Sequence, residues 1–225
     1  CGEDGERCDR AMLGAWQEIL AAAERWNDTS AACARTTFIG WEYTDHRLGS
    51  NLHRNVIFET NLVPSRPISY VDAPREWTLW ELLRRVCLEG EPGCDVIAIP
   101  HNSNISNGRM FSVDYAAANG RAAERERAKL RARLEPVVEV MQHKGDSECL
   151  LEGDTRDEAC GFEKVPYNSF AGVGRIAASG IGSSVPGSVG ADLRPTRATM
   201  VREALKQGLV LQTKLGANPL KFGLV

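Results

Sequence analysis

Apolar positions along the chain fall into blocks, and the spacing within each block predicts a helix or a strand. Apolar side chains recur at helical spacing over residues 10–26 and again over 77–87. The segments 118–134 and 200–215 are rich in Ala, Leu, Arg, Glu and Lys, which favour helices. We therefore expect four helices along the chain.

Short runs of β-branched and aromatic residues lie between these helices and predict strands. The runs are 36–44, 53–58, 94–99, 136–141 and 221–225. The run 94–99 is apolar almost without interruption, which is typical of a strand buried on both faces of a parallel sheet. Strands that alternate with helices favour parallel βα units, so the expected fold class is α/β, as a barrel or as an open doubly wound sheet.

Composition narrows the functional classes. The chain has 225 residues, of which 43% are apolar and 25% are charged, and this balance is typical of globular proteins. Its net charge is −3 and its basic residues are scattered, so we expect no nucleic-acid partner. No apolar run approaches the roughly 18 residues that a membrane span needs.

Six of the seven cysteines fall into pairs of near neighbours, each of which flanks a polar loop. Short-loop disulfides could close these loops, whereas the alternative is a set of reduced, buried thiols. Paired disulfides would imply an extracytoplasmic protein, although no signal sequence is recognisable in this chain. The expected pairs are Cys1 with Cys8, Cys87 with Cys94, and Cys149 with Cys160, which leaves Cys33 free.

Candidate catalytic residues follow the predicted strands. In β/α folds the reacting groups lie where strands end at their C-terminal edge. Glu42 ends one predicted strand, His101 follows another, and Gln142 follows a third. A carboxylate and an imidazole suit Mn²⁺, Zn²⁺ or Fe²⁺. We therefore expect Glu42 and His101 to approach each other as catalytic metal ligands.

Each of these residues also has an ordinary structural interpretation. Glu42 could pair with Arg35, and His101 could be a capping or loop residue, but their joint occurrence at strand ends favours a site. His53 lies in a polar run and could supply another ligand, while the neighbouring Arg54 could bind an anion.

The two remaining histidines, His46 and His143, are expected to be solvent or loop residues without a functional role.

Five long strings resemble a large bacterial family that carries the domain-of-unknown-function label 3604. That family is grouped with the polymerase-and-histidinol-phosphatase (PHP) type of metal phosphoesterase. The resemblance runs from about residue 10 to the end of the chain. The strings are TTFIGWEYT at 36–44, NLHRNVIF at 51–58, VPSRPIS at 63–69, IPHNSNISNG at 99–108 and VREALKQGL at 201–209.

The resemblance implies a distorted β/α barrel that binds two or three divalent metal ions and hydrolyses phosphate or phosphonate esters with a metal-activated water. On this basis Glu42 would be a metal-bridging carboxylate and His101 a metal ligand. His53, with Arg54 and Asn55, would be a further ligand or a contact to the substrate phosphate.

The resemblance also implies that Asn102, Asn104 and Gln142 line the pocket for a small-molecule ester.

Some motifs of the family are not found in this chain. Family members carry a His-x-His pair and a Thr-Asp-His string before the shared region, and an Asp-x-His string after it. We therefore expect residues 1–225 to be a single partial catalytic domain, an internal fragment with an irregular Gly/Ser-rich insertion at 171–196. Alone it should bind metal weakly and hydrolyse little; the alternative is a non-catalytic binding or scaffold remnant.

Overall fold

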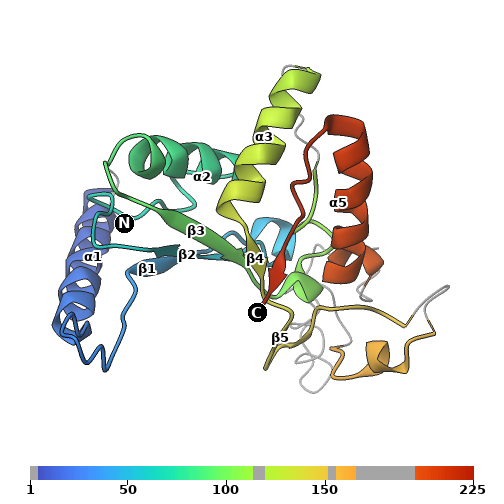
Figure 1. Ribbon diagram of the computed structural model, residues 1–225, viewed down its shortest axis with the longest axis horizontal. Helices are drawn as coiled ribbons and strands as arrows, with labels where there is room; N and C mark the ends of the chain where they lie inside the picture. Colours follow the sequence, from blue (N-terminus) through green and yellow to red (C-terminus); the bar gives the residue numbers. More distant parts are fainter. Residues whose placement is uncertain (1–4, 114–119, 152–155, 166–195) are drawn as a thin grey trace. The chain divides into compact units, whose positions relative to one another are not determined.

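The computed structural model describes residues 5–113, 120–151, 156–165 and 196–225 (Figure 1). The chain divides into two compact units. Unit 1 comprises Cys1–Tyr43 and Asn55–Ala98, and unit 2 comprises Thr44–Arg54 and Ile99–Val225.

Unit 1 combines two helices with most of a three-stranded sheet. Helix α1 spans Glu6–Trp26 and α2 spans Glu76–Leu83, continued by a π-helical turn at Arg84–Leu88. The sheet has the order β1-β2-β3. Its strands are β1 (Gly40–Tyr43), β2 (Arg54–Phe58) and β3 (Val96–Pro100). These elements confirm the helices and strands that the sequence predicts in this region.

Backbone hydrogen bonds show that β2 runs against both of its neighbours. The N–H of Phe58 donates to the carbonyl oxygen of Ile39 at 2.9 Å, and that of Glu59 donates to Asp95 at 3.0 Å. The end of β2 therefore lies beside the start of β1 and the start of β3, which is the antiparallel arrangement.

Trp16 of α1 packs the helix against this sheet. Its ring meets Trp41 edge-on at 5.6 Å between centroids and Phe58 at 6.5 Å. Its indole N–H donates to the carbonyl oxygen of Pro64 at 3.1 Å, so the polar end of the buried ring is satisfied.

The described part of unit 2 includes the helices α3 (Arg121–Leu134) and α5 (Val201–Leu215) and several short strands. Arg121 at the start of α3 donates to the carbonyl oxygen of Lys214 near the end of α5, so the helices lie antiparallel (Figure 1). β4 pairs with β7 in parallel, and β5 pairs with β6 antiparallel. The bounds are α3 Arg121–Leu134, β4 Val137–Val138, β5 Met141–Gln142, β6 Gly145–Asp146, α5 Val201–Leu215 and β7 Gly223–Leu224. The 3-10 turns are η1 Arg47–Gly49, η3 Ser103–Ile105, η4 Glu158–Gly161 and η5 Arg197–Thr199.

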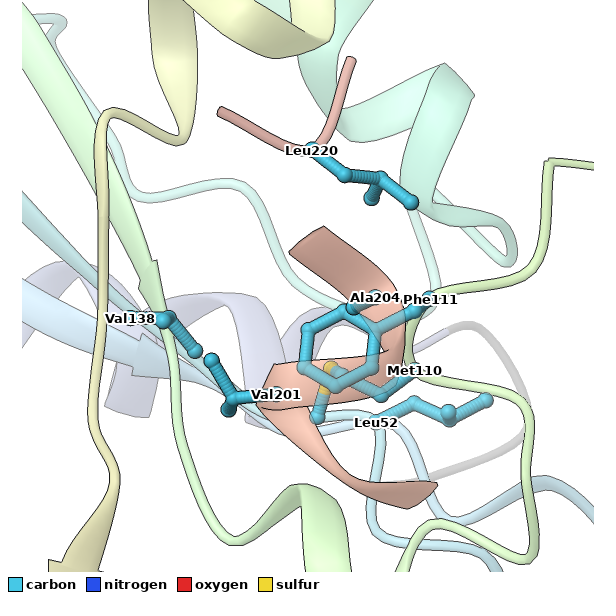
Figure 2. Packing of buried hydrophobic residues seen from close by; sticks show 7 residues of the cluster. All are labelled: Leu52, Met110, Phe111, Val138, Val201, Ala204 and Leu220. Carbon is cyan, nitrogen blue, oxygen red and sulfur yellow. The ribbon is translucent and has the colours of Figure 1, made fainter. Parts of the chain in front are cut away.

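The core of unit 2 forms where α5 packs between these strands and the loops of residues 52 and 110–111 (Figure 2). Its members come from segments far apart in the sequence, so burying them joins the unit together. They are Leu52, Met110, Phe111, Val138, Val201, Ala204 and Leu220.

The predicted β/α barrel is wrong. The described residues form sheets of three, two and two strands, and none of these sheets closes. Only residues 44–53 connect β1 to β2, whereas a crossover between parallel strands needs a dozen or more residues. The chain therefore returns antiparallel at this point, which also excludes the doubly wound alternative for this sheet. The predicted insertion at 171–196 lies outside the described residues, apart from Thr196.

Two of the predicted disulfides are confirmed. Cys87 is bonded to Cys94 and Cys149 to Cys160, with Cα atoms 5.2 and 5.1 Å apart, and Cys33 is free and exposed. The third prediction involves Cys1, which lies outside the described residues. Disulfides are compatible with an extracytoplasmic location. Within the described ranges, no helix is both long enough and apolar enough to cross a bilayer.

Candidate functional site

Three histidines of unit 2 lie together. His53 Nε2 and His46 Nδ1 are 3.3 Å apart, and their ring centroids are 4.4 Å apart. The ring of His101 also contacts His53, edge to face, with a centroid distance of 5.7 Å and an angle of 83° between the planes. His53 and His101 are each only 6% exposed, whereas His46 is exposed. His53 is therefore the centre of a small imidazole cluster.

The loop from residue 44 to 53 folds back on itself and brings His46 to His53. The N–H of Leu52 donates to the carbonyl oxygen of Asp45 at 3.0 Å and closes the loop. The buried carboxylate of Asp45 accepts from the backbone N–H and the Nε of Arg47, at 2.9 and 2.6 Å. Gly49 adopts a φ of 73°, which a side chain would disfavour, and so permits the reversal.

Asn51 joins this loop to the segment that carries His101. Its side-chain Nδ2 donates to the carbonyl oxygen of His101 at 2.9 Å, and its backbone N–H donates to Ile105 at 3.0 Å. All three residues are buried. The hydrogen bonds thus fix the backbone of His101 relative to the loop that carries His53.

The segment that follows His101 is polar and buried. Asn102 has a φ of 51°, a left-handed conformation that Asn tolerates, and Lys144 Nζ donates to its Oδ1 at 3.4 Å. Among the described residues no partner is found for Asn102 Nδ2 or for the hydroxyls of Ser103 and Ser106. Buried polar atoms without a partner are rare in folded proteins, so these three groups have hydrogen-bonding capacity left for a ligand or water.

Asn104 performs a structural task. Its Nδ2 donates to the carbonyl oxygen of Lys144 at 2.8 Å, and its Oδ1 accepts from the hydroxyl of Ser147 at 3.1 Å. Its backbone N–H donates to the same hydroxyl at 3.1 Å. The hydrogen bonds of Asn104 therefore connect the β5–β6 turn, which contains Lys144, to the segment after His101.

Arg54 is held in a buried ion-pair network. Its Nε lies 2.7 Å from Glu135 Oε1 and its Nη1 donates to the carbonyl oxygen of Leu52 at 2.8 Å. Glu135 also pairs with Arg131 at 2.9 Å, and all three charged side chains are at most 1% exposed. These contacts hold the Arg54 guanidinium in place and engage two of its donor groups within the protein.

The remaining predicted residues are distributed over both units. Gln142 is half-buried on β5 and donates from Nε2 to Glu139 at 2.9 Å. In unit 1, Glu42 is exposed on β1 and Asn55 is half-buried on β2, and their functional roles stay predictions. His143 is exposed in the β5–β6 turn, as expected.

Sequence reasoning treated His46 as a solvent or loop residue and did not predict its contact with His53. A spacing of seven residues between two histidines, across a polar loop that contains Gly49, is the signal that could have found His46.

A second group of metal-type ligands consists of Cys149, Asp157 and Cys160. Because its two cysteines are joined in a disulfide, neither offers the thiolate that a metal ion would need. The histidine cluster is therefore the stronger candidate in unit 2.

Comparison with known proteins identifies a family. The family model described as "Protein of unknown function (DUF3604)" matches residues 1–225, a range that includes every residue of the histidine cluster. No curated protein and no solved structure matches the chain.

Proposed function

We propose that this chain, which belongs to the DUF3604 family, acts in a metal-dependent hydrolase of phosphate or phosphonate esters that is related to the PHP type of phosphoesterase. The observation that carries the proposal is the pairing of His53 with His101. A ring nitrogen of each lies within 4.8 Å of the other, on two largely buried side chains.

The two imidazoles suit a divalent cation. Zinc–nitrogen bonds are about 2.0–2.1 Å long, so two nitrogens on one tetrahedral ion lie about 3.3 Å apart. The nitrogens of His53 and His101 lie within 4.8 Å of each other, and a modest rotation of either ring would bring them to this distance. The sequence assigns Glu42 as a further, metal-bridging ligand, and we retain that assignment as part of the proposal.

A bound cation would lower the pKa of a water molecule and polarise a phosphoryl oxygen. The residues of this chain would hold and orient the reacting groups. His53 and His101 would hold the cation, and Asn51 fixes the backbone of His101 through its 2.9 Å hydrogen bond.

Recognition of the anionic ester falls to Lys144 and Asn102. The Lys144 ammonium group is held 3.4 Å from Asn102 Oδ1, one residue beyond His101. A cation in this position neutralises an oxyanion through a charge-assisted hydrogen bond. Arg54 is less suited to this task because Glu135 and Leu52 already engage its Nε and Nη1.

Two measurements test the proposal. The chain should bind Zn²⁺ or Mn²⁺, and His53→Ala or His101→Ala should remove that binding while His143→Ala preserves it. A polypeptide extended by the family's His-x-His and Asp-x-His strings should hydrolyse bis-p-nitrophenyl phosphate in a chelator-sensitive way. Binding without hydrolysis in that polypeptide would favour the non-catalytic alternative, and the absence of both would refute the metal site.

A further inference from the structure

The distance between His46 and His53 agrees with two ligands on one cation. Their facing nitrogens, Nδ1 and Nε2, are 3.3 Å apart. A tetrahedral ion with bonds of about 2.0–2.1 Å requires about 3.3–3.4 Å between ligand nitrogens. The separation of the two nitrogens already meets this requirement.

A hydrogen bond explains the same distance less well. In proteins N–H···O donor–acceptor distances are commonly about 2.7–3.2 Å, so the 3.3 Å between the two ring nitrogens lies just beyond that range. The two rings also stand at 83° to each other. The loop geometry is independently fixed by Asp45 and Leu52, so the contact between the histidines is not needed to close the loop.

His101 provides a third imidazole against His53, at 5.7 Å between ring centroids, with a ring nitrogen of each within 4.8 Å of the other. His53 and His101 are buried, whereas His46 is exposed and leaves a route by which a cation can enter from solvent. The three rings come from three separate places: the start of η1, the start of β2 and the end of β3.

We infer that His46 is a metal ligand, and that His46, His53 and His101 form a three-imidazole site for a borderline divalent cation. The inference deepens the proposed metal site and does not depend on hydrolysis. Imidazole nitrogens favour Zn²⁺, Co²⁺, Ni²⁺ and Cu²⁺ over Mg²⁺, Ca²⁺ and Mn²⁺, which prefer oxygen ligands. Three protein ligands leave a coordination position open, as in catalytic zinc sites.

The experiment counts imidazoles on a bound Cu²⁺ probe by pulsed electron paramagnetic resonance. The wild type and the His143→Ala control should show the three ring ligands of unit 2, and His46→Ala should show one fewer. The affinity for Zn²⁺, measured by calorimetry, should fall at least about tenfold in His46→Ala. An unchanged imidazole count and Zn²⁺ affinity in His46→Ala would overturn the inference.

A second variant separates a ligand from a positioning residue. In His46→Asn the side-chain amide can still hydrogen-bond to His53, but it offers no imidazole to the cation. The imidazole count should stay reduced in this variant. Recovery of the wild-type Zn²⁺ affinity in His46→Asn would show that His46 only orients His53 and would refute the ligand role.

The outcomes also separate this inference from the proposed function. Cu²⁺ bound through His53 and His101 alone, with no effect of His46→Ala, would refute only the inference. A three-imidazole site in an extended polypeptide that hydrolyses no phosphodiester would refute only the hydrolase proposal. A wild-type chain that binds no cation would refute both.

Discussion

Replacing Glu135 should destabilise unit 2 more than any exposed charge change on α3. Glu135 follows the end of α3 and accepts from Arg54 Nε at 2.7 Å and from Arg131 Nε at 2.9 Å. In Glu135→Ala both guanidinium groups, at most 1% exposed in the wild type, would lose the Glu135 carboxylate.

The size of the stability loss depends on which hydrogen bonds each arginine retains in the variant. Arg54 retains its bond to the Leu52 carbonyl, and Arg131 retains bonds to the carbonyl oxygens of Ser112 and Met110. Both charges nevertheless lose their anionic partner, and breaking a buried ion pair costs about 3–5 kcal/mol. Since domains are stable by roughly 5–15 kcal/mol, this is a large part of the total.

The assay must report on unit 2. All five tryptophans lie in unit 1, so their fluorescence would not report the loss. Urea unfolding followed by far-ultraviolet circular dichroism, with hydrogen–deuterium exchange of α3 and α5, measures it directly.

The matched control is Glu126→Gln on the same helix. Glu126 pairs with Lys129 at 2.7 Å, but the two side chains are 68% and 50% exposed. Loss of such a solvent-exposed surface pair should leave the stability nearly unchanged. If Glu135→Ala were as mild as this control, the Arg–Glu–Arg network would not stabilise unit 2, and the structural role assigned to Arg54 would be wrong.

Three further outcomes are expected. Replacing both Cys149 and Cys160 by Ser should cost about 2–3 kcal/mol, because the bond closes a short loop, and limited proteolysis should then cut residues between them. Lys144→Ala should weaken inorganic phosphate binding at least about tenfold without changing Zn²⁺ affinity, as calorimetry would show; an equal loss of metal would contradict its role. The pKa of Glu203 lies below its ordinary value of 4.5, first because Arg197 donates to it. The ionised Glu203 carboxylate therefore stabilises the fold at pH values above 4.5, and this stabilisation is lost as the pH falls through the lower pKa of the folded state. Glu203→Gln should accordingly lower the thermal unfolding midpoint at neutral pH but not in strong acid.

Helices and disulfides were predictable because they depend on residues close in sequence. The Ala-, Arg- and Glu-rich composition of 118–134 is enough to predict α3, observed at Arg121–Leu134. Cys87 and Cys94 are seven residues apart around a turn, so their pairing requires no knowledge of the fold.

Strand direction was not predictable from the same patterns. The apolar run before His101 suggested a strand buried on both faces, but β3 alternates between buried and half-buried positions. Such alternation belongs to an antiparallel sheet with one covered face. The short connection of residues 44–53 favoured this arrangement, and the apolar run alone gave no indication of it.

Part of the candidate site could be predicted from strand positions, and part of it could not. His53 and His101 adjoin strands, so a pattern of strand ends points to them, and the structure brings their rings together. His46 joins them only because Leu52 hydrogen-bonds to Asp45 and reverses the loop. Hydrophobic periodicity does not predict a loop reversal that depends on a backbone hydrogen bond, so the contact of His46 with His53 could not be predicted from it.

The most direct test of a metal site in unit 2 is a calorimetric titration of the chain with Zn²⁺, repeated for His53→Ala and for His143→Ala. His53 is the ring that contacts both other imidazoles of the cluster, whereas His143 is exposed in the β5–β6 turn. We predict that Zn²⁺ binding by the wild type is retained in His143→Ala and lost in His53→Ala. Equal Zn²⁺ binding by the wild type and His53→Ala, or none by the wild type, would contradict the account.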